Sequence, residues 1–204
     1  MTLPLFAAED VAVTLAKESE FHPTPEGVLS ALLNGMREAG HEPLPLDGRV
    51  RESAAGEGAL AEQLLRLAPS PRRTLILHEL RAAAANRLRE RFPGVLVIQG
   101  DFLANPIGHA RVDVDITNPP WSRALEWAEA ALQTATHVAL HVPLATVETP
   151  ERRAFFRKHP ADLYPLDWRP NYDGRGTIGR AVCWLVWGPG RGGRWFPLSR
   201  PEAS

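Results

Sequence analysis

The sequence has few of the features that mark secreted or membrane proteins. It contains one cysteine, Cys183, which excludes an internal disulfide and fits a reducing, cytoplasmic setting. Cys183 lies in the apolar run 181–187, which favours a buried core position over a reactive thiol. No apolar run reaches 18 residues, so we expect no membrane span. Residues 1–10 lack the basic and apolar parts of a signal peptide.

Two common kinds of ligand site are also missing. No Gly-x-x-x-x-Gly-Lys-Ser/Thr motif occurs, and the glycine turn at 55–58 has no Lys or Arg to meet a phosphate. This argues against ATP and, less strongly, against NAD. The seven histidines show no metal-binding spacing; His137 and His141 share one strand face but have no third ligand, so we predict no metal.

The bulk composition indicates one ordinary domain. With 204 residues, 44% apolar and 23% charged, the chain can form a full core as a single domain over residues 1–204. The net charge of -1 argues against indiscriminate nucleic-acid binding, but it divides into -7 over residues 1–151 and +6 over residues 152–204. The basic quarter faces a polyanion or is an ordinary solvated surface, and charge asymmetry does not separate the two.

Apolar patterning predicts alternating strands and helices. Strands are expected over residues 50–53, 74–78, 95–99, 112–117, 137–143, 162–168 and 181–187. Helices are expected over residues 11–15, 26–36, 81–92, 122–134 and 151–159, and from the glycine turn to residue 67. Thr24 is the expected N-cap of the helix at 26–36. The order predicts an α/β fold with a mostly parallel sheet, helices on both faces and a terminal antiparallel hairpin.

Candidate ligand residues fall at the carboxyl ends of three predicted strands, where such sheets bind ligands. Gly56 and Gly58 lie between a strand and a helix and would let the backbone approach a ligand. Glu79 suits the two hydroxyls of a ribose, or is a solvated acid at a helix start. Asp101 suits the amino group of an adenine beside Phe102, or is a turn aspartate. Together they describe a pocket for a nucleoside without phosphates.

The segment Asn118-Pro119-Pro120-Trp121 directly follows the predicted strand 112–117. Two prolines make the backbone stiff and unable to continue a ladder. The Asn118 side-chain oxygen and the Pro119 carbonyl are then two acceptors beside the flat Trp121 ring. A planar group with an exocyclic NH₂ would fit there, by hydrogen bonds to the acceptors and by stacking. A strand end with a turn is the alternative.

These motifs and their order resemble the class I S-adenosylmethionine (SAM)-dependent methyltransferases of the amino-methylating branch. The chain is most similar to adenine-N6 DNA methyltransferases of the small, phage-type kind, over about residues 21–187. The resemblance implies a Rossmann-like fold with a seven-stranded sheet, SAM as cofactor, and nucleic acid, DNA above all, as partner. It implies methyl transfer to the N6 amino group of adenine.

The resemblance also assigns roles to single residues. It implies a catalytic role for the tetrapeptide 118–121, with Trp121 stacking on the target base. It implies substrate contacts by Arg169 and Tyr172 in a loop facing the base, and phosphate contacts by Arg169, Arg175 and Arg180. The implied cofactor-binding residues are Phe21, His22, Thr24, Glu52, Ala54, Gly56, Gly58, Glu79, Leu80, Asp101, Phe102 and Asn118.

The chain departs from the family pattern in three ways. Ser53 stands where proline is usual, and Arg49 and Arg51 stand in a strand that is usually apolar. No separate target-recognition domain is expected, so a homodimer or a partner could supply specificity. Adenine in RNA and a protein glutamine amide present similar NH₂ geometry and stay open as substrates. A catalytically silent nucleic-acid-binding or regulatory subunit is the alternative of another class.

Overall fold

The computed structural model describes residues 22–105, 108–172 and 179–201. The helix predicted over residues 11–15, the cofactor residue Phe21 and the phosphate contact Arg175 lie outside these ranges. Within them, no helix is both long and apolar enough to cross a bilayer.

The described part of the chain alternates strands and helices as predicted. The strands are β1 (Arg49–Glu52), β2 (Thr74–Glu79), β3 (Leu96–Gln99), β4 (Val112–Thr117), β5 (Ala135–Pro143), β6 (Asp162–Pro165) and β7 (Val182–Trp187). The helices are α2 (Val28–Glu38), α3 (Ala59–Leu67), α4 (Ala82–Arg91), α5 (Ala124–Leu132) and α6 (Pro150–Lys158), with short 3₁₀ helices η2 (Trp121–Arg123) and η3 (Leu144–Val147).

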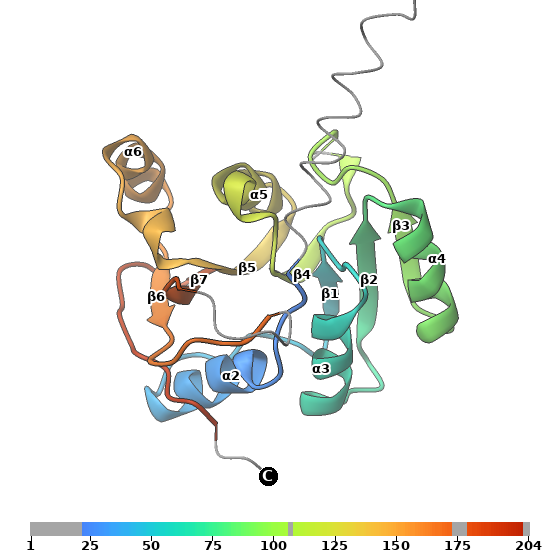
Figure 1. Cartoon of the computed structure of the whole chain (residues 1–204), viewed down its shortest axis with the longest axis horizontal. Coiled ribbons are helices and arrows are strands. Elements are labelled where there is room, and N and C mark those ends of the chain that lie inside the picture. Colours follow the sequence, from blue (N-terminus) through green and yellow to red (C-terminus); the bar gives the residue numbers. More distant parts are fainter. Residues whose placement is uncertain (1–21, 106–107, 173–178, 202–204) are drawn as a thin grey trace, which may run out of the picture.

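All seven strands join one sheet in the order β3-β2-β1-β4-β5-β7-β6 (Figure 1). β1 to β5 run parallel, whereas β7 is antiparallel to both β5 and β6. The predicted mostly parallel, seven-stranded sheet with a terminal hairpin is therefore confirmed. The strand order reverses between β1 and β4, so the carboxyl ends of these two strands lie side by side at the switch point, where open α/β sheets bind their ligands.

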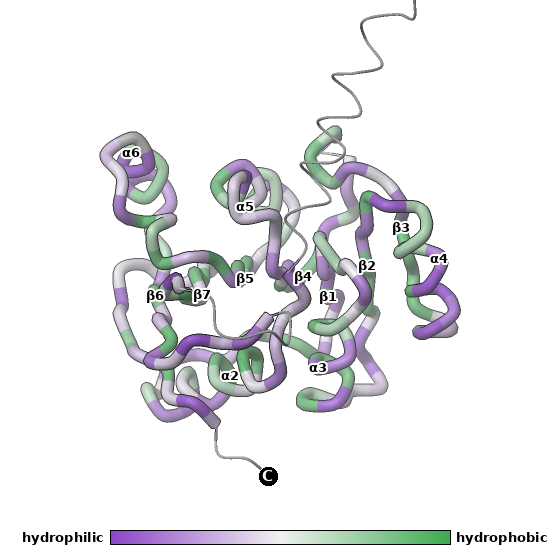
Figure 2. Tube along the Cα trace, viewed as in Figure 1, coloured by the Kyte–Doolittle hydropathy of each residue, from purple (hydrophilic) through white to green (hydrophobic). Residues whose placement is uncertain are grey.

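Helices cover both faces of the sheet: α2 and α3 lie on one side, and α5 and α6 on the other (Figure 1). Every residue of β7 is buried, which explains its continuous apolar sequence. Apolar residues gather along β5 and β7 in Figure 2. Cys183 belongs to this core and is fully buried, as predicted, and burial raises the pKa of its thiol.

The start of α2 corrects one prediction. The helix begins at Val28 rather than at residue 26, and its N-cap is Gly27 with φ of 86°, not Thr24. Residues 22–25 instead form a lead-in ahead of the helix, and the Gln63 side chain of α3 donates hydrogen bonds to the Thr24 and Pro25 carbonyls at 3.1 and 3.2 Å. These bonds hold the lead-in over the carboxyl ends of the strands.

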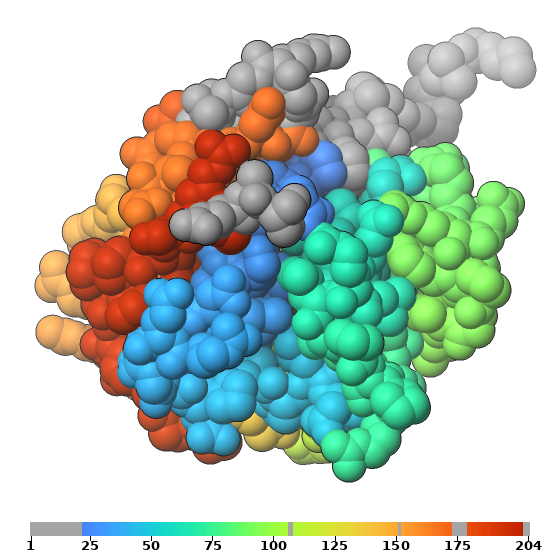
Figure 3. All heavy atoms as spheres, turned by 90° about the horizontal axis from the view of Figure 1, so that it is seen from below, coloured from blue at the N-terminus to red at the C-terminus, as the bar shows by residue number. Residues whose placement is uncertain are grey.

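A segment after the hairpin, residues 194–198, forms a C-terminal strap along the outer edge of β6. Leu163 donates its N–H to the Arg194 carbonyl at 2.8 Å, and Phe196 donates to the Leu163 carbonyl at 3.0 Å. Leu198 packs against α2 so closely that Gly35 has no room for a Cβ. Figure 3 shows this segment (red) beside α2 (blue). The strand predicted over residues 162–168 ends at Pro165. Beyond it, Leu166 still forms a β-bridge with Leu198 of the strap.

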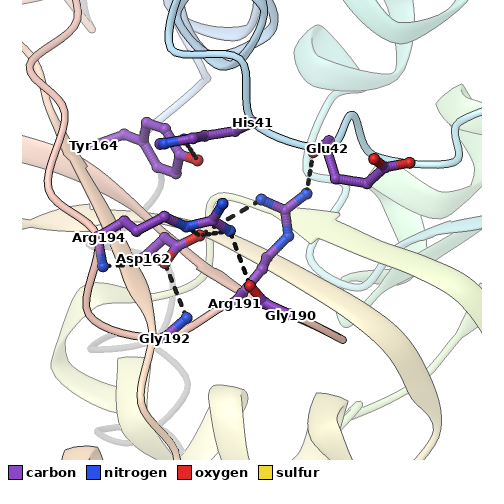
Figure 4. A network of polar contacts seen from close by, with 8 residues as sticks. All are labelled: His41, Glu42, Asp162, Tyr164, Gly190, Arg191, Gly192 and Arg194. Carbon is purple, nitrogen blue, oxygen red and sulfur yellow. Dashed lines mark hydrogen bonds and ion pairs between the residues drawn. The ribbon is translucent and has the colours of Figure 1, made fainter.

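A buried carboxylate anchors the strap (Figure 4). Asp162 accepts hydrogen bonds from Nη2 of Arg194 at 2.6 Å and from the Gly192 N–H at 2.9 Å. Arg191 lies 3.6 Å from the same carboxylate and reaches the Glu42 carbonyl on the other side of the network. Two of the basic residues of the C-terminal quarter are thus used inside the molecule.

Candidate functional site

A cavity of about 960 Å³ opens at the carboxyl ends of β1, β2 and β4. This volume lies near the upper end of the range for small-molecule sites. Most of the residues predicted to bind the cofactor or to act in catalysis line it. They are His22, Thr24, Glu52, Ala54, Gly56, Glu79, Leu80, Asp101, Phe102, Asn118 and Pro120.

The remaining predicted residues lie elsewhere. Gly58, Pro119, Trp121, Arg169 and Tyr172 are not among the residues that line the cavity. Gly58 is the N-cap of α3 with φ of 84°, and the side chains of Leu88 in α4 and of Phe92, the C-cap of α4, leave no room for a Cβ there. Its lack of a side chain therefore serves the packing of α3 against α4, whereas we had expected it to approach the cofactor.

The glycine turn lies against the end of β2. Gly56 has φ of 58°, and its N–H donates to Oε2 of Glu79 at 2.8 Å. The other oxygen of Glu79 accepts from the backbone N–H of Arg81 at 2.9 Å and from its guanidinium at 2.8 Å. A carboxylate offers about four lone-pair positions, so Glu79 retains capacity for a further donor.

Glu52, the last residue of β1, is a buried acid at the wall of the cavity. It is only 2% exposed, and its Oε2 has no hydrogen-bond partner among the described residues. Burial, reinforced by the negative charges of Asp115 and Glu79, raises the pKa of this carboxyl well above its ordinary value. A buried, unsatisfied carboxyl oxygen at a cavity wall is a ready acceptor for a cationic N–H donor.

Asp101 and Phe102 form the wall beyond β3. Asp101 accepts a hydrogen bond from the Leu103 N–H at 3.0 Å, which is a turn contact. The Phe102 ring is 1% exposed, stacks on His109 at 4.5 Å and carries the Arg51 guanidinium 4.9 Å from its centroid. The ring is thus largely engaged by the protein, and any contact with a ligand uses its edge or its backbone.

One polar network explains two departures from the family pattern. Arg51 of β1 and Asp115 of β4 are register partners, and they form a buried ion pair at 2.8 Å. Ser53 donates to the second oxygen of Asp115 at 2.8 Å and accepts from the Trp127 indole at 2.9 Å. A further Arg51 nitrogen donates to the Thr134 hydroxyl at 2.9 Å. The network fastens β1 to β4 directly below the cavity.

The predicted catalytic tetrapeptide follows β4 without interruption. Asn118 lines the cavity, and its amide nitrogen donates to the His22 carbonyl at 2.7 Å. Its Oδ1 accepts from the Trp121 indole N–H at 2.9 Å. Pro119 is buried, and Pro120 leads into η2. The nitrogen and the oxygen of the Asn118 amide are therefore both held, one by the distant residue His22 and the other by its near neighbour Trp121.

The substrate residues expected after β6 divide into two kinds. Arg169 is exposed. Tyr172 is 4% exposed, and its hydroxyl lies 2.5 Å from Nε2 of His141. Burial raises the pKa of Tyr172 and lowers that of His141 to about 3, so the contact joins two neutral groups. At 4% exposure, with its ring edge-on to Trp121 at 5.4 Å, Tyr172 has little surface left to cover a base.

Sequence reasoning missed several residues of the cavity. Arg81, Ser122, Arg123 and Trp127 also line it. Two signals were present: Arg81 lies two positions after the strand-end acid, and Ser122-Arg123 directly follows the tetrapeptide. Trp127 could not be found in this way, because its position depends on how α5 packs. No group of three or more His, Cys, Asp and Glu side chains suited to a metal ion occurs in the described parts of the chain.

No protein-family model matches the sequence, and no curated protein matches it. Solved structures do. A candidate RNA methyltransferase from Pyrococcus horikoshii is 23% identical, with a TM-score of 0.61 over 82% of this chain and 86% of that one. A type I restriction-modification methyltransferase subunit from Streptococcus thermophilus is 14% identical, with a TM-score of 0.66 over 87% of this chain and 47% of that one. The chain thus spans about half of that subunit.

The 23S rRNA methyltransferase ErmE is 16% identical, with a TM-score of 0.57 over 84% of this chain and 71% of that one. The chain has the Rossmann-like methyltransferase fold. At these identities the likeness establishes the fold alone, and the chemistry of the cavity has to be argued from its own residues.

Proposed function

We propose that this protein transfers a methyl group from SAM to the N6 amino group of adenine in DNA. The observation that carries the proposal is the place of Asn118. Its amide oxygen follows β4 at the topological switch point, beside a cavity that also holds Glu52, Gly56 and Glu79. A rigid acceptor at this edge suits a planar group with an NH₂, as the tetrapeptide predicted.

The residues present fit SAM. The unsatisfied Oε2 of Glu52 suits the positively charged amino group of the methionine part. Glu79, fixed by the Gly56 N–H, suits the ribose hydroxyls, and Asp101 suits the adenine amino group. His22, Pro23 and Thr24 of the lead-in line the same cavity. When bound, SAM supplies a methyl group on a positively charged sulfur.

The chain contributes position and electrostatics to the transfer. Asn118 Oδ1 and the Pro119 carbonyl accept the two N–H bonds of the target amino group, which turns its nitrogen lone pair toward the cofactor side of the cavity. Both acceptors also stabilise the positive charge that develops on this nitrogen. The amino group gives up a proton after transfer, and no covalent bond to the protein is needed.

Two observations support a nucleic acid as substrate. Arg191 and Arg194 form ion pairs with Asp162, but other cations of the C-terminal quarter are exposed, among them Arg169 and Arg180. Such residues suit backbone phosphates. Two of the similar structures belong to proteins named for RNA, and a third to a restriction-modification system. We propose that a second copy of the chain or another partner contributes to sequence preference.

Tritiated SAM incubated with mixed-sequence DNA, followed by nucleoside analysis of the digest, tests the proposal. Label in N6-methyladenine is the expected result. Label in RNA or in a protein glutamine, with none in DNA, would keep the transfer reaction and overturn the substrate. If calorimetry shows no SAM binding, the proposed enzymatic activity is wrong, and a catalytically silent subunit with a methyltransferase fold is favoured.

Asn118→Ala should abolish transfer while leaving SAM binding nearly unchanged. Removing one donor or acceptor that acts in a transition state typically costs about 100- to 1,000-fold in kcat. The measurement is label transfer beside the calorimetric Kd for SAM. Asn86→Ala, on the exposed face of α4, is the matched control. A variant at position 118 with normal turnover would remove Asn118 from the reaction.

A further inference from the structure

The amide of Asn118 is held in one orientation by two contacts of opposite polarity. Its nitrogen donates to the His22 carbonyl at 2.7 Å, and its oxygen accepts from Nε1 of Trp121 at 2.9 Å. Reversing the amide would set its NH₂ against the indole N–H and its carbonyl against the His22 carbonyl. These two contacts therefore decide which end of the side chain is the acceptor, a choice that an amide does not make by itself.

Packing determines where the indole lies. Its ring stacks on the His22 ring, with centroids 4.7 Å apart and an interplanar angle of 29°. The Tyr172 ring meets it edge-on at 5.4 Å and 89°. Tyr172 is in turn tied to His141, a buried residue of β5. The indole N–H is thus aimed by a frame of aromatic rings that come from three separate parts of the chain.

We propose that Trp121 is a positioning residue, whose indole N–H orients the Asn118 carbonyl toward the target amino group. An amide oxygen has two lone pairs, and the indole occupies one of them. Asn118 lines the cavity, so the second is left for an N–H of the substrate. This inference rests on the proposed function, because the amino group that it positions is that of the substrate.

The role differs from the stacking platform that the tetrapeptide suggested. One face of the indole is already covered by His22, so a base can stack on it only after His22 moves or on the opposite face. The N–H donor also distinguishes Trp from the other aromatic residues. Phe has no donor, and the hydroxyl of Tyr lies at the far tip of its ring. Position 121 therefore takes Trp for a reason that ring area alone does not supply.

Loss of the donor should affect turnover more than cofactor affinity. Without the indole N–H, the His22 carbonyl alone restrains the Asn118 amide, and the broad sp³–sp² terminal torsion lets its oxygen tilt away from the target. A misplaced acceptor costs catalysis on the order of 10- to 100-fold. Glu52, Glu79 and Asp101 keep their places, so the Kd for SAM should stay within about twofold, since each such contact is local.

The first test compares Trp121→Phe with Trp195→Phe in the full chain. Trp195 is 63% exposed on the strap and makes the same substitution a matched control. We expect kcat to fall about 10- to 100-fold in the first variant only, with KM and Kd for SAM nearly unchanged. Unchanged kcat overturns the proposal. An equal loss of SAM affinity also overturns it, because it would mean that Trp121 merely supports the cavity.

A second test needs no activity. The indole ¹⁵N–¹H resonance of Trp121 is assigned by its loss in Trp121→Phe, and its hydrogen exchange is then compared between the wild type and Asn118→Ala. We expect the Trp121 resonance to shift and to exchange faster in Asn118→Ala, and that of Trp195 to stay. An unmoved Trp121 resonance refutes the contact, whatever the enzyme does. A wild type that shows the contact but methylates no substrate contradicts the proposed function instead.

Discussion

Glu52 is a residue whose protonation the fold and the cofactor control in opposite directions. Its side chain is buried among other acids, and burial raises its pKa well above the ordinary 4.5. A cationic donor bound at its free oxygen would lower that pKa again. Binding of the cofactor should therefore release a proton from Glu52, because the carboxyl becomes charged only when its partner arrives.

Glu52→Gln separates the two effects. A raised folded-state pKa contributes stability that is complete below the unfolded value and is lost as the pH rises through the folded pKa. The variant should lack this decline, so its stability relative to the wild type should increase as the pH rises above 4.5. Its affinity for SAM should fall by about 1.5–3 kcal/mol, the usual contribution of a hydrogen bond to a charged group.

Urea unfolding at several pH values and calorimetry with SAM check both halves of this expectation. Glu129→Gln, an exposed acid of α5, is the control for the amide substitution. A variant that binds SAM as tightly as the wild type would place the methionine end of the cofactor elsewhere in the cavity.

At the scale of elements, β1 and β4 are joined by a charge pair in a place where apolar side chains are usual. Both members are almost completely buried, Arg51 at 1% and Asp115 at 0% exposure. The pair is satisfied by Ser53, Thr134 and the Ala110 carbonyl. A buried pair of this kind adds little net stability over apolar residues, but it becomes costly once one partner is lost.

Asp115→Val should therefore lower the free energy of unfolding by about 3–5 kcal/mol, because it leaves a buried guanidinium without its carboxylate. Adding Arg51→Leu should recover most of this loss, since the second change removes the stranded charge. Urea unfolding of the two single variants and the double variant measures the coupling. A double variant as unstable as Asp115→Val would show that the network does more than balance its own charges.

Most elements were predictable because their causes are local. The alternating run over residues 112–117 predicted β4, the continuous apolar run over residues 181–187 predicted β7, and the residues at strand ends pointed to the cavity before its shape was known. The Arg51–Asp115 pair was not predictable, because it depends on the register between two strands that are far apart in the sequence. The same holds for the contact of Asn118 with His22, and for that of Tyr172 with His141.

At the scale of the whole molecule, the Asp162 network joins the end of the chain to the hairpin. Burial alone would raise the pKa of Asp162, but hydrogen bonds from Arg194 and from the Gly192 N–H outweigh it and hold the pKa below the ordinary 3.8. A depressed folded-state pKa contributes stability above the unfolded value and loses it as the pH falls through the folded pKa. The network should thus weaken only in strong acid.

Asp162→Asn should lower stability at pH 7 by about 3 kcal/mol, because two guanidinium groups lose their counter-charge. The difference from the wild type should shrink as the pH falls below 3.8 toward the lowered folded-state pKa, where the native wild-type carboxyl takes up a proton. Urea unfolding at pH 7 and pH 3 gives both values. A difference that is the same at the two pH values would mean that Asp162 acts through shape rather than charge.

The strap also makes the two edges of the sheet differ in their capacity to pair with a strand of another chain. A bare edge strand is a template on which another chain can pair. On one side, β6 is already paired with residues 194–198, and the outward rim of that strap carries Pro197, which has no N–H to offer. On the other side, β3 is the last strand of the sheet among the described residues, with Leu96 and Ile98 partly exposed. The two edges of the sheet therefore differ: a strand of another copy can pair with β3, whereas the strap prevents such pairing at the β6 edge.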